Sequence, residues 1–151
     1  MKRLLKSPAF NAVCIDLFTA FYATVFFTAS KNNMFKNNAT YQKTGFFWPA
    51  WSGFLANGHQ RYIVYVLTVV TIVITVLLIA RRQPYDEYHI SILLNCLVAA
   101  IILTLTAIAI FYLMILIEPA GIAEKFTFFI FVHWTTVVFA DLAFVLLCRL
   151  Y

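Results

Sequence analysis

Long apolar runs separated by short polar segments are the dominant pattern of this chain. An apolar run of about 20 residues can cross roughly 30 Å of hydrocarbon as an α-helix. The four runs of this kind are Ala9–Ser30, Tyr62–Ala80, Ile90–Ile117 and Phe126–Leu147. Because the last two connections are short, consecutive helices should lie side by side in opposite directions. The pattern predicts an all-α protein, a four-transmembrane-helix antiparallel bundle that forms a single membrane domain over residues 1–151.

The first connection, residues 31–61, is the longest and predicts a short interfacial helix. Pro49 suits the first position of a helix, and the Asn57-Gly58 pair suits its end. Trp48, Trp51 and Phe54 would then act as interfacial anchors in the headgroup region, where aromatic rings settle. The alternative interpretation of this segment is a flap over an outer vestibule.

Composition supports a membrane protein, since 64% of the residues are hydrophobic and 11% are charged. The mean hydropathy is +0.89. A water-soluble domain of 151 residues cannot bury so much apolar surface, which excludes ordinary globular and disordered classes. The formal net charge of +5 suits contact with anionic lipid headgroups, so we expect the lipid bilayer as a partner and no nucleic acid.

Basic residues set the expected orientation, because Lys and Arg in short loops favour the cytoplasmic side. With both termini inside, the six inner basic residues are Lys2, Arg3, Lys6, Arg81, Arg82 and Arg149. The five outer ones are Lys31, Lys36, Lys43, Arg61 and Lys125. The basic N-terminus and the Arg81-Arg82 pair favour an N-in/C-in protein of a cytoplasmic-type (plasma) membrane. We interpret the first run as a retained helix because it is longer than a signal peptide's apolar region and contains Asp16.

Small and polar residues recur at helical spacing along each run, which indicates faces that pack against other helices. In the first run, Asp16 belongs to a stripe of alanines. In the third run, one stripe comprises Ser91, Asn95, Ala99, Thr106 and Ala109, and the opposite one comprises Ala100, Thr104 and Ala107. The third helix is therefore predicted to pack on two sides. In the fourth, Ile130, Trp134, Val137, Asp141 and Cys148 share a face.

Depth along the helices predicts a shared polar layer. At 1.5 Å per residue, Asp16, Asn95 and Asp141 each lie on the order of 8–11 Å from the same membrane face, and Thr75 is close to that level. A carboxylate in hydrocarbon is costly and needs a partner. If Asp16 and Asp141 are close, they are expected to share a proton or a cation. The alternative is a polar clasp that fixes helix register.

The outer half of the helices holds a second set of polar candidates: Thr68, Tyr112 and His133. His133 is interpreted as a hydrogen-bonded packing residue, with a haem or quinone ligand as the alternative. The sequence contains no nucleophile–base arrangement, phosphate-binding glycine loop or metal-ligand spacing. We therefore expect a non-enzymatic protein without catalytic residues, cofactor or metal. Cys14, Cys96 and Cys148 are expected to be free thiols.

Two functional hypotheses fit these features. The first is an accessory, regulatory or immunity-type subunit that binds other membrane proteins or forms a homo-oligomer. The alternative is a small proton- or cation-coupled transporter or channel that uses Asp16 and Asp141. The architecture is superficially similar to that of small multidrug-resistance transporters, which have four helices and one acidic residue in the first. The chain departs from that pattern in its length, its extended first connection and Asp141, so it is not assigned to that family.

Overall fold

The structure, a computed structural model, describes residues 7–31, 47–81, 84–119 and 121–150, and all the regular secondary structure in them is helical. The helices are α2 (Pro8–Lys31), α3 (Phe47–Ala56), α4 (Gln60–Ala80), α5 (Glu87–Ile117) and α6 (Ile122–Leu150). Four of them, α2, α4, α5 and α6, are long and apolar enough to cross a membrane. This confirms the four predicted runs and suggests a multi-pass membrane protein.

The helix ends follow the local sequence. Asp86 is the N-cap of α5, and its side chain accepts a hydrogen bond of 2.9 Å from the backbone N–H of His89. This cap starts α5 three residues before the predicted Ile90, because a side-chain acceptor satisfies a free N–H of the first turn. Helix α6 starts at Ile122, four residues before the predicted Phe126, and directly follows Gly121, whose φ of +67° suits a glycine.

The predicted short helix in the first connection is present as α3. Gly58 follows it with a φ of +76°. The N–H of Gly58 donates to the Leu55 carbonyl at 3.0 Å, and the N–H of His59 donates to the Phe54 carbonyl at 3.1 Å. These two bonds satisfy the carbonyls of the last turn, as the predicted glycine ending requires. The observed start of the helix differs from the predicted one, because α3 begins at Phe47 and not at Pro49. Pro49 lies in the first turn, where its missing N–H removes no helical hydrogen bond.

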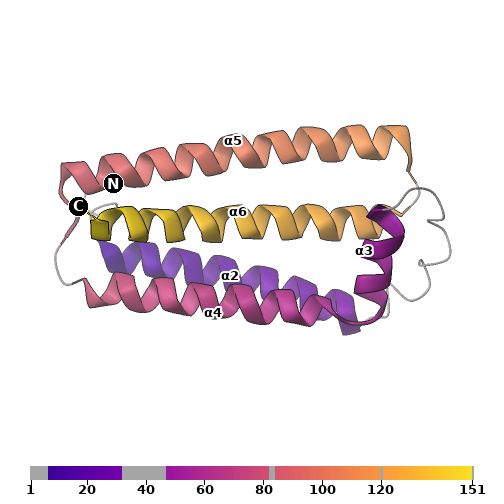
Figure 1. Cartoon of the computed structure of the whole chain (residues 1–151), viewed down its shortest axis with the longest axis horizontal. Coiled ribbons are helices and arrows are strands. Elements are labelled where there is room, and N and C mark those ends of the chain that lie inside the picture. Colours follow the sequence, from indigo (N-terminus) through magenta and orange to yellow (C-terminus); the bar gives the residue numbers. More distant parts are fainter. Residues whose placement is uncertain (1–6, 32–46, 82–83, 120, 151) are drawn as a thin grey trace.

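Helix α6 is the centre of the arrangement. It lies between α5 on one side and the α2–α4 pair on the other (Figure 1) and also contacts α3. Helix α5 is peripheral and packs mainly against α6. Of the most apolar 18 residues of each helix, 6% are buried in α5 and 33% in α6. Within this chain α5 packs on one side, and the predicted second face, from Ser91 to Ala109, is exposed.

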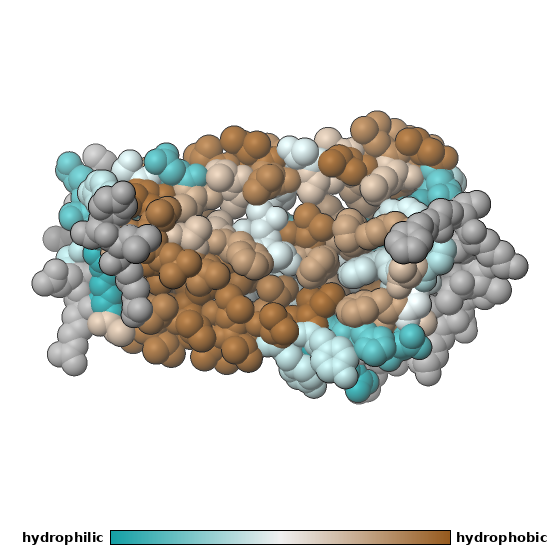
Figure 2. Space-filling model, in the orientation of Figure 1, coloured by the Kyte–Doolittle hydropathy of each residue, from teal (hydrophilic) through white to brown (hydrophobic). Residues whose placement is uncertain are grey.

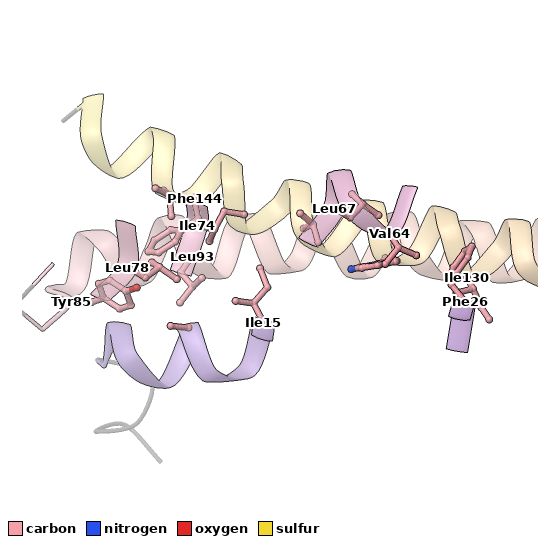
Figure 3. Packing of buried hydrophobic residues seen from close by; sticks show 14 residues of the cluster. Ile15, Phe26, Val64, Leu67, Ile74, Leu78, Tyr85, Leu93, Ile130 and Phe144 are labelled. Atoms are coloured by element: carbon pink, nitrogen blue, oxygen red, sulfur yellow. The ribbon is translucent and has the colours of Figure 1, made fainter. Parts of the chain in front are cut away.

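The core is a continuous apolar cluster that runs the length of the bundle (Figure 3). It contains Ile15 of α2, Ile74 of α4 and Trp134 of α6, of which Ile74 and Trp134 have no exposed surface. Side chains of this shape stabilise helices in a membrane by close packing, because lipid tails are as apolar as the core itself. The predicted inward face of the fourth helix is confirmed by the burial of Ile130, Trp134 and Asp141.

A chain of hydrogen bonds crosses the core and joins three helices. The Trp134 Nε1–H donates to Thr19 Oγ1 at 3.4 Å. Thr19 Oγ1 lies 3.0 Å from Thr71 Oγ1, which donates in turn to the Leu67 carbonyl at 2.9 Å. Each hydroxyl can thus accept one bond and donate the next. These hydrogen bonds satisfy the Trp134 indole and the hydroxyls of Thr19 and Thr71, which α6, α2 and α4 bring together in the core.

The surface has an apolar middle and hydrophilic ends (Figure 2). Large exposed side chains along the middle include Leu17 of α2, Val69 of α4 and Leu105 of α5. An apolar belt of this kind between two polar ends is the surface that a bilayer requires.

We predict that Trp134→Ala strongly destabilises the bundle. Truncating a buried aromatic residue leaves a cavity that costs about 3–5 kcal/mol, and here it also removes the donor to Thr19. Thermal unfolding in detergent measures the effect as a lower melting temperature. Phe139→Ala is the matched control, because Phe139 lies on the same helix and is 56% exposed. Equal melting temperatures for the two variants would contradict the proposed packing.

Candidate functional site

Asp16 reaches α4 from the outside of the bundle. The Thr75 hydroxyl donates a hydrogen bond of 2.7 Å to its Oδ1, so the structure brings these two predicted site residues together. The Asp16 side chain is nevertheless exposed, as are Ala9 and Ala20 of the same stripe. Of the alanines predicted to share the face of Asp16, Ala12 is buried and Ala23 is half-buried, so the stripe is only partly turned inward. Ile15, beside Asp16 in the sequence, is buried in the core. A carboxylate thus remains at the outer surface of an apolar helix.

Asn95, the third predicted member of the polar layer, lies on the exposed face of α5. It makes no hydrogen bond with another described residue. Its neighbours at helical spacing are exposed as well: Ser91, Ala99, Thr106 and Ala109. We call these five residues the α5 stripe. Asn95 does not join Asp16 or Asp141, because α5 packs on α6 through its opposite face, which includes Ala100.

Asp141 points into the bundle, where it is 6% exposed. Its partner is Asn11 of α2, whose amide lies between this carboxyl and the hydroxyl of Tyr85. Neither Asn11 Nδ2 nor Tyr85 Oη has a hydrogen bond of normal geometry, so these contacts are long or poorly aligned. Asp16 and Asp141 thus have different partners, Thr75 and Asn11. Within the described residues, no contact joins the two carboxylates.

Asn11 and Tyr85 are site residues that sequence reasoning missed. Asn11 is an amide inside an apolar run, which is the signal that singled out Asp16. Tyr85 lies in the turn between α4 and α5, and no periodicity marks it. Burial raises the pKa of the Tyr85 hydroxyl to about 12, while Asn11 and Arg81 act weakly in the opposite direction. This phenol therefore stays protonated, since desolvation disfavours its anion.

The turn between α4 and α5 also holds a charged arrangement. Arg81 Nη2 lies 2.6 Å from His89 Nε2. A guanidinium only donates hydrogen bonds, so His89 Nε2 accepts, and its Nδ1–H bonds Asp86 Oδ1. The Arg81 guanidinium carbon also lies 5.5 Å from the ring centre of Tyr85, within cation–π range.

In the half of the bundle that holds α3, His133 bonds to a neighbouring helix (Figure 1). Its Nδ1 lies 2.6 Å from the Tyr22 hydroxyl of α2, and its ring stacks on Phe129 at 6.1 Å. These contacts support a packing histidine. Of the other two outer candidates, Thr68 is half-buried and Tyr112 is exposed on α5. His133 is therefore not brought together with Tyr112.

Two of the three predicted interfacial anchors, Trp48 and Trp51, pack on α6, and the third, Phe54, stacks on Trp51. Trp51 donates from Nε1 to the Glu124 carbonyl at 3.1 Å, and its ring lies 5.2 Å from that of Phe128. Trp48 contacts Phe128 at 6.0 Å and lies under the ammonium group of Lys125 at 5.8 Å. Phe54 stacks on Trp51 at 5.6 Å. These half-buried rings join α3 to the bundle and expose their remaining surface at its end.

At this end of the bundle, the buried basic side chain has partners and the buried acidic one does not. Lys125 is buried, donates to the Glu118 carbonyl and lies 3.7 Å from the Glu118 carboxylate. The adjacent Glu124 is fully buried, and neither of its carboxylate oxygens has a hydrogen-bond partner. Among the residues that the structure describes, no group of three or more His, Cys, Asp and Glu side chains could hold a metal ion. Cys14, Cys96 and Cys148 are free.

Comparisons with known proteins give no match to a family model, to a curated protein or to a solved structure. The class of protein is therefore defined by the fold alone: an all-helical chain whose four long apolar helices suggest a multi-pass membrane protein.

The cap at Asp86 generates a prediction about pH. Hydrogen bonds from the backbone N–H and the ring of His89 hold the pKa of Asp86 below its ordinary value. The stabilisation is therefore present above the unfolded pKa of about 3.9 and is lost as the pH falls through the lower folded value. We expect Asp86→Ala to lower the melting temperature at neutral pH and the difference from the parent chain to shrink below about pH 4.

Thermal unfolding in detergent over a pH series measures this difference. Glu87→Ala is the control, because Glu87 is the exposed neighbour of Asp86 and makes no side-chain hydrogen bond with the described residues. A melting-temperature loss for Asp86→Ala that stays constant to low pH would show that the carboxylate form of Asp86 is not what stabilises the turn.

Proposed function

We propose that this chain is a small multi-pass membrane protein that acts as a non-enzymatic accessory, regulatory or immunity-type subunit. Its four long helices would cross a cytoplasmic-type membrane as an antiparallel bundle with both termini inside. The helix lengths and the apolar belt between polar ends support this proposal. Its partner would be another membrane protein or a second copy of this chain, bound through helix surfaces within the bilayer.

The observation that carries the proposal is the exposure of Asp16 within an apolar helix. A carboxylate accepts about four hydrogen bonds, and a single bond from Thr75 is present. An acidic residue at a helix centre costs roughly 2.5–3.5 kcal/mol on insertion scales unless a partner compensates it. A helix of another chain with a hydrogen-bond donor or a basic residue at this depth would supply the missing partner.

The α5 stripe supports the same function from the other side of the molecule. Its small residues would let a second helix approach closely, and Asn95 could hydrogen-bond across the contact. Lipid acyl chains would not stabilise this face, because they offer the Asn95 amide no hydrogen-bond partner. Among the four long helices, α5 is the least buried within the chain, which leaves this face uncovered.

We predict that Ala99→Phe disrupts partner binding. A bulky ring in the middle of the α5 stripe would separate the helices and reduce the captured partner or oligomer about tenfold, the factor that 1.4 kcal/mol represents. The chain is extracted from its native membrane in a mild detergent and analysed by pull-down and by light scattering. Leu94→Phe is the matched control, because Leu94 is exposed on the same helix but lies off the stripe. A parent chain that is a lone monomer under these conditions would contradict the proposal.

A proton- or cation-coupled transporter or channel is the second candidate function. It is favoured by the burial of Asp141 beside Asn11, which places a carboxyl inside the bundle. In that function Asp16 and Asp141 would be the coupling carboxylates. Reconstituted into liposomes with a pH gradient, the chain should then carry a proton flux that Asp16→Asn and Asp141→Asn each reduce at least about tenfold. Equal flux in both variants and the parent chain would eliminate this role.

A further inference from the structure

A cavity of about 290 Å³ lies at the end of the bundle where α4 stops. Its lining combines two chemistries. Leu77, Phe144 and Val145 form an apolar wall, and Arg81, Tyr85 and Cys148 form a polar side. The Tyr85 ring meets the Phe144 ring edge-on at 5.3 Å, and the close-up shows both at the same end of the core (Figure 3). A pocket with apolar walls and a few convergent polar groups is typical of a binding site for a small molecule.

The charge in this cavity comes from Arg81. Its hydrogen-bond partners are His89 Nε2, a neutral acceptor, and the Cys148 thiol. Asp86 lies beyond the His89 ring and interacts with Arg81 through their opposite charges without forming an ion pair. Asp141 interacts with Tyr85 rather than with Arg81. In the described part of the chain, no carboxylate forms an ion pair with the guanidinium. His89 and the Tyr85 ring therefore hold Arg81 in position while its positive charge remains available to a ligand.

The position of the cavity indicates what kind of molecule would bring a negative charge to Arg81. Leu77 lies inside the apolar helix α4, and Arg81 follows its last residue, Ala80. The cavity thus extends from the apolar belt to the polar end of the molecule. We propose that it binds one anionic phospholipid, with the phosphate on Arg81 and the start of an acyl chain along Leu77, Phe144 and Val145. Basic pockets between membrane helices bind anionic headgroups in this way.

This inference uses the membrane location given under the proposed function but not the proposed partner, so the two can fail separately. The detergent-solubilised chain is titrated with phosphatidylglycerol and with phosphatidylcholine of identical acyl chains, and bound lipid is counted by native mass spectrometry. We expect phosphatidylglycerol to bind about fivefold better, the gain expected for one arginine at an anionic headgroup. Arg81→Gln should remove this preference. Arg61→Gln should retain it, because Arg61 is exposed at the start of α4.

A second variant tests the acyl-chain part of the site without touching the charge. Leu77→Trp fills the apolar wall at a half-buried position and should lower phosphatidylglycerol binding several-fold while Arg81 remains in place. Glycerol phosphate, which has the charge and no tail, should compete poorly.

Three results would overturn the proposal. They are equal binding of the two lipids by the parent chain, an unchanged preference in Arg81→Gln, and competition by glycerol phosphate as strong as that of the lipid. The last result would assign the cavity to a soluble phosphate compound. Helical content and elution volume confirm that each variant is folded before its binding is compared.

Discussion

A polar group buried away from water needs a hydrogen-bond partner inside the protein, and this constraint shapes the interior of the bundle. A series of hydrogen bonds runs from Trp134 through Thr19 and Thr71 to the Leu67 carbonyl and gives polar groups of three helices their partners. An unpaired donor at that depth would cost several kcal/mol, so the three side chains fix the relative register of α2, α4 and α6. The hydrogen bond between Tyr22 and His133 joins α2 and α6 in the same way, nearer the end that holds α3.

The central place of α6 follows from its side chains. Its buried face combines large apolar groups with a few polar ones that reach α2, and its opposite flank supports α5. Helix α5 contributes little to the core and exposes most of its apolar surface. On the outside of the bundle, the α5 stripe and Asp16 of α2 leave hydrogen-bonding capacity unused. The α5 stripe and Asp16 therefore suggest contact with a partner, whereas the buried Asp141 suggests polar packing inside the bundle.

The two ends of the bundle differ in the way they place charge. At the turn between α4 and α5, Asp86 holds His89, and His89 holds Arg81 over the Tyr85 ring. The arginine is thereby fixed without being neutralised, which leaves it available to an anion beside an apolar cavity. At the other end, Lys125 forms an ion pair with Glu118 and lies over the Trp48 ring. Trp51 of α3 bonds to the adjacent Glu124 carbonyl.

The sequence by itself determined the helices, because about 20 apolar residues in a row leave a chain few alternatives in lipid. It also determined the ending of α3 at Gly58, where a left-handed residue is required. For Asp16 and Thr75, the rise per residue of a helix predicted that the two side chains lie at a similar depth, but it did not predict the hydrogen bond between them. Rotation about the helix axes was not predictable, because small and polar residues suit an internal contact and an external partner equally well. Only the tertiary structure decided that Asn95 faces outward, that Asp141 meets Asn11, and that Tyr85 folds back from a turn into the core, since packing among all the helices selects which face each one buries.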